Sequence, residues 1–294
     1  MLKRKTLSET IFQILLIMFF ILFSICTLYP FVSNFSLSFM TPGEANRIGI
    51  KLIPREVTLD AYIIAFSSGV IMRAYMNSIL RVVVGTSLSI LTMIMGAYAL
   101  SKKYLPHRNF YTMFIVITMF IGGGLIPTYL LIMNLGMLNT FWALVIPGMI
   151  STFSMVIIRN FFMNLPDELE ESAKMDGAND ILILFKIIVP ISLPVIATVS
   201  LWTAVGHWNS WFDAMIYVSS NPKMMTLALF LRRIIIENDV LTFSMMDTTE
   251  RIKPAFQATL KAAVLMLTTL PILIVYPFLQ KYFVQGIMVG SLKG

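Results

Sequence analysis

The feature that most limits how this chain can fold is a series of long apolar stretches separated by short polar segments. The first stretch, residues 11–32, has no charged residue and is long enough to cross the roughly 30 Å hydrocarbon core of a bilayer as a helix. Only 13% of the residues are charged, whereas soluble domains have about 25%. We therefore predict an all-α integral membrane protein.

Six such stretches make the whole chain, residues 1–294, one membrane domain. The predicted spans are 11–32, 75–100, 109–126, 140–163, 187–212 and 256–279. The segments 33–74 and 213–255 are predicted outer loops, with a short interfacial helix over 57–66, and residues 280–294 are a predicted cytoplasmic tail. The first stretch exceeds the about 7 to 15 residues of a signal-peptide core, so it is expected to remain as a span.

Basic residues set the expected orientation. The short loop between the second and third spans carries Lys102, Lys103 and Arg108 and no acidic residue. Short loops rich in lysine and arginine stay in the cytoplasm. The N-terminal run Lys3-Arg4-Lys5 is basic as well. With six spans, both termini are predicted to be cytoplasmic.

A polar element, residues 164–186, interrupts the apolar pattern between the fourth and fifth spans. Asn164 can cap a first short helix that starts near Leu165, and acidic residues follow at the positive end of its dipole. Gly177 can take the left-handed conformation that ends a helix, and Asn179 or Asp180 can cap the next one. Such a polar corner is costly in hydrocarbon, so it is predicted to be a docking surface in water.

This element resembles the EAA motif of ABC importer permeases. The matching residues are Glu171-Ser172-Ala173, Asp176-Gly177-Ala178 and, further on, Ile188, Pro190 and Pro194. Ser172 stands where the family usually has alanine, which is a change from one small residue to another. The resemblance to the maltose-type carbohydrate permeases extends over essentially the whole chain and implies a type I ABC importer fold.

In that family the corresponding loop is a coupling helix that docks on a cytoplasmic ATPase. The resemblance therefore implies a set of ATPase-coupling residues here: Glu170, Glu171, Ser172, Ala173, Met175, Asp176, Gly177 and Ala178. It also implies a multi-pass protein of the bacterial cell membrane. Its implied partners are a second permease, two ATPase subunits that carry the ATP and Mg, and an extracellular or periplasmic sugar-binding protein.

Several residues are candidates for the substrate pathway. They are Gly123, Tyr129, Trp208, Asn209, Arg81 and Lys261. Gly123 lies in a Gly-Gly-Gly-Leu-Ile-Pro tract that predicts either a broken helix at membrane depth or a helix end followed by a short packed helix. Tyr129, Trp208 and Asn209 lie in tracts that resemble carbohydrate permeases, although tryptophans also anchor helices among headgroups. Arg81 and Lys261 are charges inside spans, and they either face substrate or snorkel to the surface.

Other classes of function fit the sequence less well. The chain has no G-x-x-x-x-G-K-[ST] phosphate loop, so ATP is expected on another polypeptide and the chain is expected to be non-catalytic. Two histidines and one cysteine make a metal site improbable. The excess of basic residues is assigned to topology and lipid headgroups rather than to nucleic acid. The alternatives are an ion-coupled secondary transporter and an ABC permease for a solute other than sugar.

The expected cargo is an oligosaccharide that contains uronic acid. The glycine tract resembles relatives associated with acidic oligosaccharides. The outer loops are also rich in cations that could attract an anionic sugar, although contacts with a binding protein would account for them equally well. These cations are Arg47, Lys51, Arg55, Arg73, Lys223, Arg232, Arg233, Arg251 and Lys253.

Overall fold

The computed structural model describes residues 7–49, 51–67, 69–236 and 254–291, and these ranges contain helices and no β-strand beyond one isolated bridge between Met40 and Val57. The all-α prediction is confirmed. The chain divides into two compact units, residues 1–69 with 234–269, and residues 70–233 with 270–294.

The first unit contains α1 (Leu7–Ser38), α2 (Pro42–Ala45), α3 (Asp60–Ser67) and the beginning of α15 (Pro254–Ser291). Helix α1 is apolar on all sides, and its large hydrophobic side chains are exposed, as expected of a helix whose solvent is lipid. Its C-terminal end packs on α3, where the hydroxyls of Ser38 and Tyr62 lie 2.8 Å apart. The short helix expected over 57–66 is present as α3.

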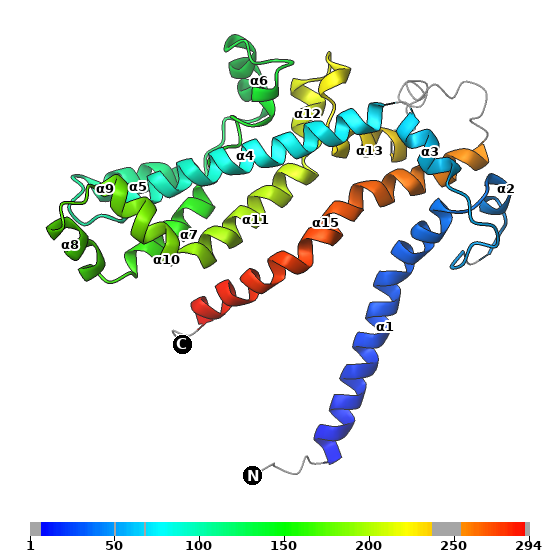
Figure 1. Cartoon of the computed structure of the whole chain (residues 1–294), viewed down its shortest axis with the longest axis horizontal. Coiled ribbons are helices and arrows are strands. Elements are labelled where there is room, and N and C mark those ends of the chain that lie inside the picture. Colours follow the sequence, from blue (N-terminus) through cyan, green and yellow to red (C-terminus); the bar gives the residue numbers. More distant parts are fainter. Residues whose placement is uncertain (1–6, 50, 68, 237–253, 292–294) are drawn as a thin grey trace. The chain divides into compact units, whose positions relative to one another are not determined.

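The second unit is built on α4 (Val70–Ser101), which runs beside α7 (Thr152–Met163) and α11 (Leu193–Asn209) in Figure 1. Two glycines of α4 allow this close packing. A Cβ on Gly85 would lie 2.6 Å from Nε2 of His207 in α11, and one on Gly96 would lie 2.9 Å from Sδ of Met155 in α7. A buried core formed by Met93, Ala97, Ile158, Ile183 and Ile188, among others, joins these helices at the C-terminal half of α4.

The third and fourth predicted spans, 109–126 and 140–163, are not continuous helices in the structure. Helix α5 (Arg108–Ile117) ends before the glycine tract, and α6 (Leu125–Asn134) follows it. A 3-10 turn, η1 (Phe141–Leu144), then precedes α7. Gly124 has a φ of +81° at the start of α6, so the glycine tract ends one helix and begins another. This matches the second of the two structures expected for the tract.

The fifth predicted span, 187–212, is bent rather than straight. Helix α9 (Asp180–Ile183) is followed by a π-helical turn η2 (Leu184–Ile188) and by α10 (Val189–Ile191). The axis of this segment, Asp180–Ile191, is bent by 85° relative to that of α11. Pro190 has no N–H to donate to the preceding turn, and a widened turn before it is a common consequence. Pro194 lies in the first turn of α11, where a missing N–H costs little.

Three described helices are long and apolar enough to cross a membrane: Leu7–Ser38, Val70–Ser101 and Phe256–Pro277. The bent pair Asp180–Ile191 and Leu193–Asn209 is a fourth candidate. The number of six crossings therefore remains a prediction. Helix α15 continues to Ser291, so most of the segment predicted as a tail, 280–294, is helical.

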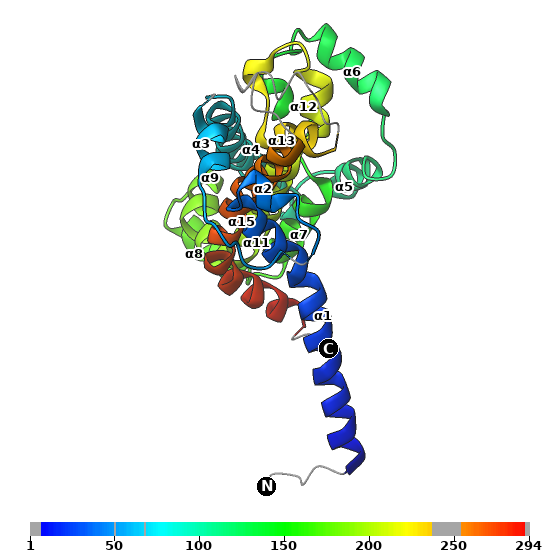
Figure 2. The same ribbon diagram turned by 90° about the vertical axis from the view of Figure 1, so that its right-hand side faces the viewer.

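The remaining elements of the second unit are α8 (Glu168–Met175), α12 (Phe212–Tyr217), η3 (Pro222–Met224) and the beginning of α13 (Leu227–Ile235). Figure 2 shows α12 beside α6, and Tyr129 of α6 stacks on Tyr217 of α12 with ring centroids 6.4 Å apart. Helix α8 lies beyond the C-terminal end of α4, and α12 lies over the N-terminal half of α4 (Figure 1). These two helices belong to the two candidate functional regions.

Candidate functional site

Helix α8 begins later than the sequence predicted. It starts at Glu168, so the predicted start near Leu165 is wrong, and Asn164 does not cap it. Instead, Asn164 ends α7, and its Nδ2 donates to the carbonyl of Asn160 at 2.7 Å. Three glutamates occupy the first turn of α8, where carboxylates suit the positive end of the helix dipole.

The corner after α8 is a Schellman motif. The N–H of Gly177 donates to the carbonyl of Lys174 and the N–H of Ala178 to that of Ala173, both at 3.0 Å. Gly177 has a φ of +80°, as the sequence predicted. Asn179 caps α9 by accepting from the N–H of Leu182 at 2.8 Å. The shape of the corner is therefore fixed by local backbone chemistry.

The basic loop 101–108 holds this corner in place from one side. Lys102 pairs with Glu170, and Nζ of Lys103 lies 2.6 Å from Oδ2 of Asp167. The hydroxyl of Tyr104 donates to Oδ2 of Asp180 at 3.2 Å. The two polar segments that were expected on the same side of the membrane are thus in direct contact at the C-terminal end of α4.

These contacts alter two acid–base equilibria at the surface. The hydrogen bond from Lys103 lowers the pKa of Asp167 below its ordinary value. Burial, followed by the charge of Asp180, raises the pKa of Tyr104. Both residues therefore keep their usual charge states near neutral pH.

The predicted coupling residues divide into two groups. Those that face the rest of the chain are Glu170, Ala173 and Ala178, and Ala173 belongs to the buried core. Those that face outward are Glu171, Ser172, Met175 and Asp176, together with Gly177 at the corner. Met175 is 88% exposed, so its whole side chain is available to a partner. The outer face of α8 is an acidic surface with one apolar residue at its end.

The other region is a cavity of about 660 Å³ near the N-terminal half of α4. Its lining combines aromatic side chains with hydroxyl groups. Its lining includes Arg81, Thr128, Ser151, Trp202, Thr203, His207, Ser210, Phe212, Asp213 and Tyr217. A cavity of this size and composition can accommodate a polar ligand of one or two sugar rings.

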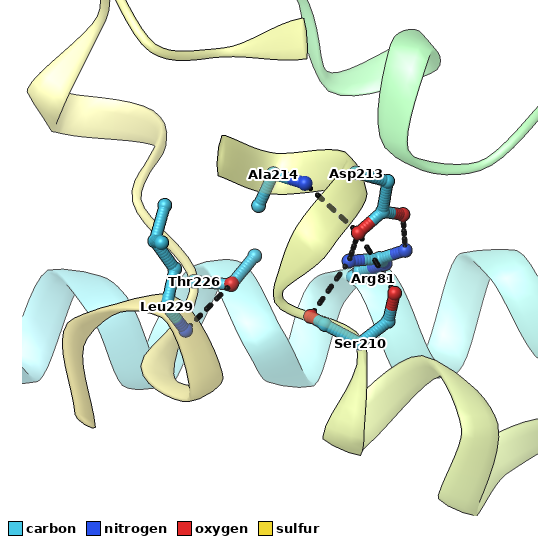
Figure 3. A network of polar contacts seen from close by, with 6 residues as sticks. All are labelled: Arg81, Ser210, Asp213, Ala214, Thr226 and Leu229. Atoms are coloured by element: carbon cyan, nitrogen blue, oxygen red, sulfur yellow. Dashed lines mark hydrogen bonds and ion pairs between the residues drawn. The ribbon is translucent and has the colours of Figure 1, made fainter. Parts of the chain in front are cut away.

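An ion pair forms one wall of this cavity. Figure 3 shows Arg81 bonded to both carboxylate oxygens of Asp213 and, at 3.2 Å, to the carbonyl of Ser210. Oδ1 of Asp213 also accepts from the hydroxyl of Ser210 at 2.7 Å and from the N–H of Ala214 at 2.8 Å. In the same view the N–H of Leu229 donates to Thr226 at 3.4 Å. Arg81 is only 3% exposed, so of the two alternatives for this residue its burial disfavours snorkelling to the surface.

The other pathway candidates lie elsewhere. Tyr129 packs against Tyr217 and does not line the cavity, although its neighbour Thr128 does. Trp208 faces a separate apolar groove and meets the ring of Tyr75 edge-on at 6.2 Å. Asn209 and Gly123 are exposed. Lys261 lies in the compact unit that does not contain the cavity.

Of the residues that line the cavity, sequence reasoning named only Arg81, and it missed the others, among them Trp202, His207, Ser210 and Asp213. An arginine inside a span calls for a carboxylate or for backbone carbonyls as partners, but this signal does not single out Asp213. Among the described residues, no group of three or more His, Cys, Asp and Glu side chains could hold a metal ion.

The described chain combines apolar helices long enough to cross a membrane, an exposed acidic helix beyond the C-terminal end of α4, and a polar cavity beside the N-terminal half of α4. The model of the family described as "Binding-protein-dependent transport system inner membrane component" matches residues 3–289. The chain belongs to this family and is the transmembrane permease subunit of an ABC importer.

Individual relatives agree with this assignment. The chain is 38% identical to the polygalacturonan/rhamnogalacturonan transport system permease protein YtcP of Bacillus subtilis (strain 168), with 98% of this chain and 100% of the relative covered. It is 40% identical to the protein LplC of the same organism, with 91% and 90% covered. Among solved structures, it is similar to a chain of a bacterial ABC transporter involved in the import of the acidic polysaccharide alginate. The TM-score is 0.87 and the identity 29%, with 95% of this chain and 99% of that chain covered. The type I importer fold is thereby confirmed.

Proposed function

We propose that this chain forms one half of the translocation pathway of an ABC importer for oligosaccharides that contain uronic acid. By family membership it works with a second permease, two ATPase subunits and an extracellular or periplasmic binding protein. The chain is not itself catalytic, and its work is to transmit force from the ATPase and to line the pathway. The single observation that carries this proposal is the outward acidic face of α8, fixed by a Schellman corner, in a chain that matches the family over residues 3–289.

The docking face is the four-residue surface formed by Glu171, Ser172, Met175 and Asp176. Its carboxylates suit a basic partner, and the exposed side chain of Met175 suits an apolar socket. Because an ATPase is a cytoplasmic protein, α8 and the loop 101–108 lie on the cytoplasmic side. The positive-inside rule gives the same side for that loop, and both termini then follow as cytoplasmic if the chain crosses six times.

The cargo is inferred from two relatives and from the cavity. One relative is named for polygalacturonan and rhamnogalacturonan, and one solved neighbour imports alginate, so both handle acidic polysaccharides. The cavity offers the aromatic faces of Trp202 and Tyr217 and the hydroxyls of Thr128 and Thr203. Flat apolar faces and hydroxyls match the two sides of a sugar ring.

The test is reconstitution of the tagged chain with its partner permease, ATPase and binding protein in proteoliposomes. We expect the ATPase to co-purify and the complex to hydrolyse ATP faster with an oligogalacturonate than with a maltooligosaccharide of equal length. Full stimulation by the neutral sugar and none by the acidic one would refute the cargo. Uptake that continues without ATP and stops when an ionophore collapses the ion gradients would refute the class and support a secondary transporter.

A further inference from the structure

Two neighbouring lysines, Lys102 and Lys103, bind the polar element 164–186, here called the coupling element, in different environments. The side chains of Lys102 and Glu170 are 10% and 19% exposed, whereas those of Lys103 and Asp167 are 76% and 69% exposed. Pairs of the second kind are screened by water and contribute little. In a shielded pair, the loss of one partner leaves the other charge poorly solvated. Lys102 and Glu170 therefore constrain each other far more than Lys103 and Asp167 do.

The shielded pair is joined to the end of α4. Nζ of Lys102 lies 3.8 Å from the ring centroid of Tyr98, one turn back in that helix, so it makes a cation–π contact as well as the ion pair. The carbonyl of Leu100 accepts from Nε of Arg159 in α7 at 3.0 Å. Lys102 is thus held by the last turn of α4, and Glu170 projects from α8 to meet it.

Helix α4 links this contact to the cavity. It is continuous from Val70 to Ser101 and contains no proline. At 1.5 Å per residue, Arg81 and Ser101 are separated by about 30 Å along one helix axis. A displacement of the C-terminal end of α4 therefore reaches the wall of the cavity without crossing a hinge.

We propose that the Lys102–Glu170 ion pair is the contact that transfers a displacement of α8 to α4. On this assignment Glu170 is a positioning residue that acts through Lys102, not a contact with the ATPase as its place in the motif suggested. The exposed Lys103–Asp167 pair does not transfer this displacement. The inference rests on the proposed docking of an ATPase on α8, and it names the contact through which that docking moves the pathway.

The experiment uses the reconstituted complex and compares four forms of the chain: native, Lys102→Met, the charge exchange Lys102→Glu with Glu170→Lys, and the matched control Lys103→Met. The readouts are the amount of ATPase retained, the rate of ATP hydrolysis, and the oligogalacturonate imported per ATP. The third readout separates transmission of force from simple assembly of the complex.

We expect Lys102→Met to retain the ATPase but to import roughly five- to tenfold less sugar per ATP, a change within the usual range of coupling between sites. The charge exchange should restore most of the loss, and Lys103→Met should match the native chain. A native ratio in Lys102→Met, or an equal fall in Lys103→Met, overturns the inference alone. Failure of the native chain to retain any ATPase overturns the proposed function and the inference with it.

Discussion

The corner at Gly177 permits a graded prediction, because its cost can be worked from backbone geometry. A residue with a Cβ in the left-handed region pays roughly 1–2 kcal/mol relative to glycine. No heavy atom lies within 4 Å of a Cβ added at Gly177, so Gly177→Ala incurs this backbone cost and no collision. A cost of that size changes the ratio of two conformations by about 5- to 30-fold. Asparagine visits this region more readily, so Gly177→Asn should cost less.

Proline at the same position is a more severe change. Its φ is fixed near about −65°, and it lacks the N–H that donates to Lys174 at 3.0 Å. The corner cannot form, and α8 loses its direction relative to α9.

The assay measures ATPase retained by the tagged chain and sugar imported, both normalised to the amount of chain in the membrane. We expect both readouts to fall in the order native, Gly177→Asn, Gly177→Ala, Gly177→Pro, while the amount of chain in the membrane stays unchanged. Normal retention and normal uptake in Gly177→Pro would refute the reasoning, because no other backbone conformation gives the same corner.

Three further predictions concern topology, the docking face and the buried ion pair. Cysteines placed at the exposed positions His107 and Asn179 should resist a membrane-impermeant thiol reagent added outside, whereas one at Lys223 should react. Labelling of the cysteine at Asn179 would show that the predicted orientation is wrong. Glu171→Lys should leave the chain folded, since this side chain is exposed, and should reduce the ATPase retained; native retention would remove Glu171 from the docking face. Arg81→Met should destabilise the chain by about 3–5 kcal/mol, seen as a lower thermal midpoint in detergent, because it leaves a carboxylate unpaired. Adding Asp213→Leu to the Arg81→Met chain removes the unpaired carboxylate and should recover most of the lost stability. If the thermal midpoint does not rise, the unpaired carboxylate is not the cause of the loss.

Local chemistry made parts of the coupling element predictable from sequence. The left-handed glycine and the cap at Asn179 depend on residues within a few positions, and both are present as expected. The predicted start of α8 near Leu165 was wrong because an asparagine that follows an apolar helix can end that helix instead of beginning the next one. Asn164 bonds back to Asn160 and is the C-cap of α7.

Contacts between distant parts of the chain were beyond the sequence. Asp213 lies 132 positions from Arg81, and nothing in either tract specifies that they meet. The bend before α11 depends on a π-helical turn and a buried Ser192, whereas the prolines alone were compatible with a straight span. The inward turn of Glu170 depends on Lys102, which belongs to another loop. These features arise from tertiary packing, which decides among several locally acceptable structures.

The charge balance of the cavity bears on how an acidic sugar passes through it. The sequence placed Arg81 among the residues that could face substrate, but Asp213 pairs with it and is itself held by Ser210 and Ala214. A carboxylate in the cavity therefore meets an ion pair rather than a free cation, and the charge of Asp213 offsets the attraction of Arg81. A pathway must release its cargo as well as admit it, and an unpaired arginine at this depth would hold an anion tightly. If the proposed cargo is right, we therefore expect selection for acidic sugars to be made before the cavity, at the binding protein or the outer loops, and the cavity wall to contact the sugar through aromatic faces and hydroxyls.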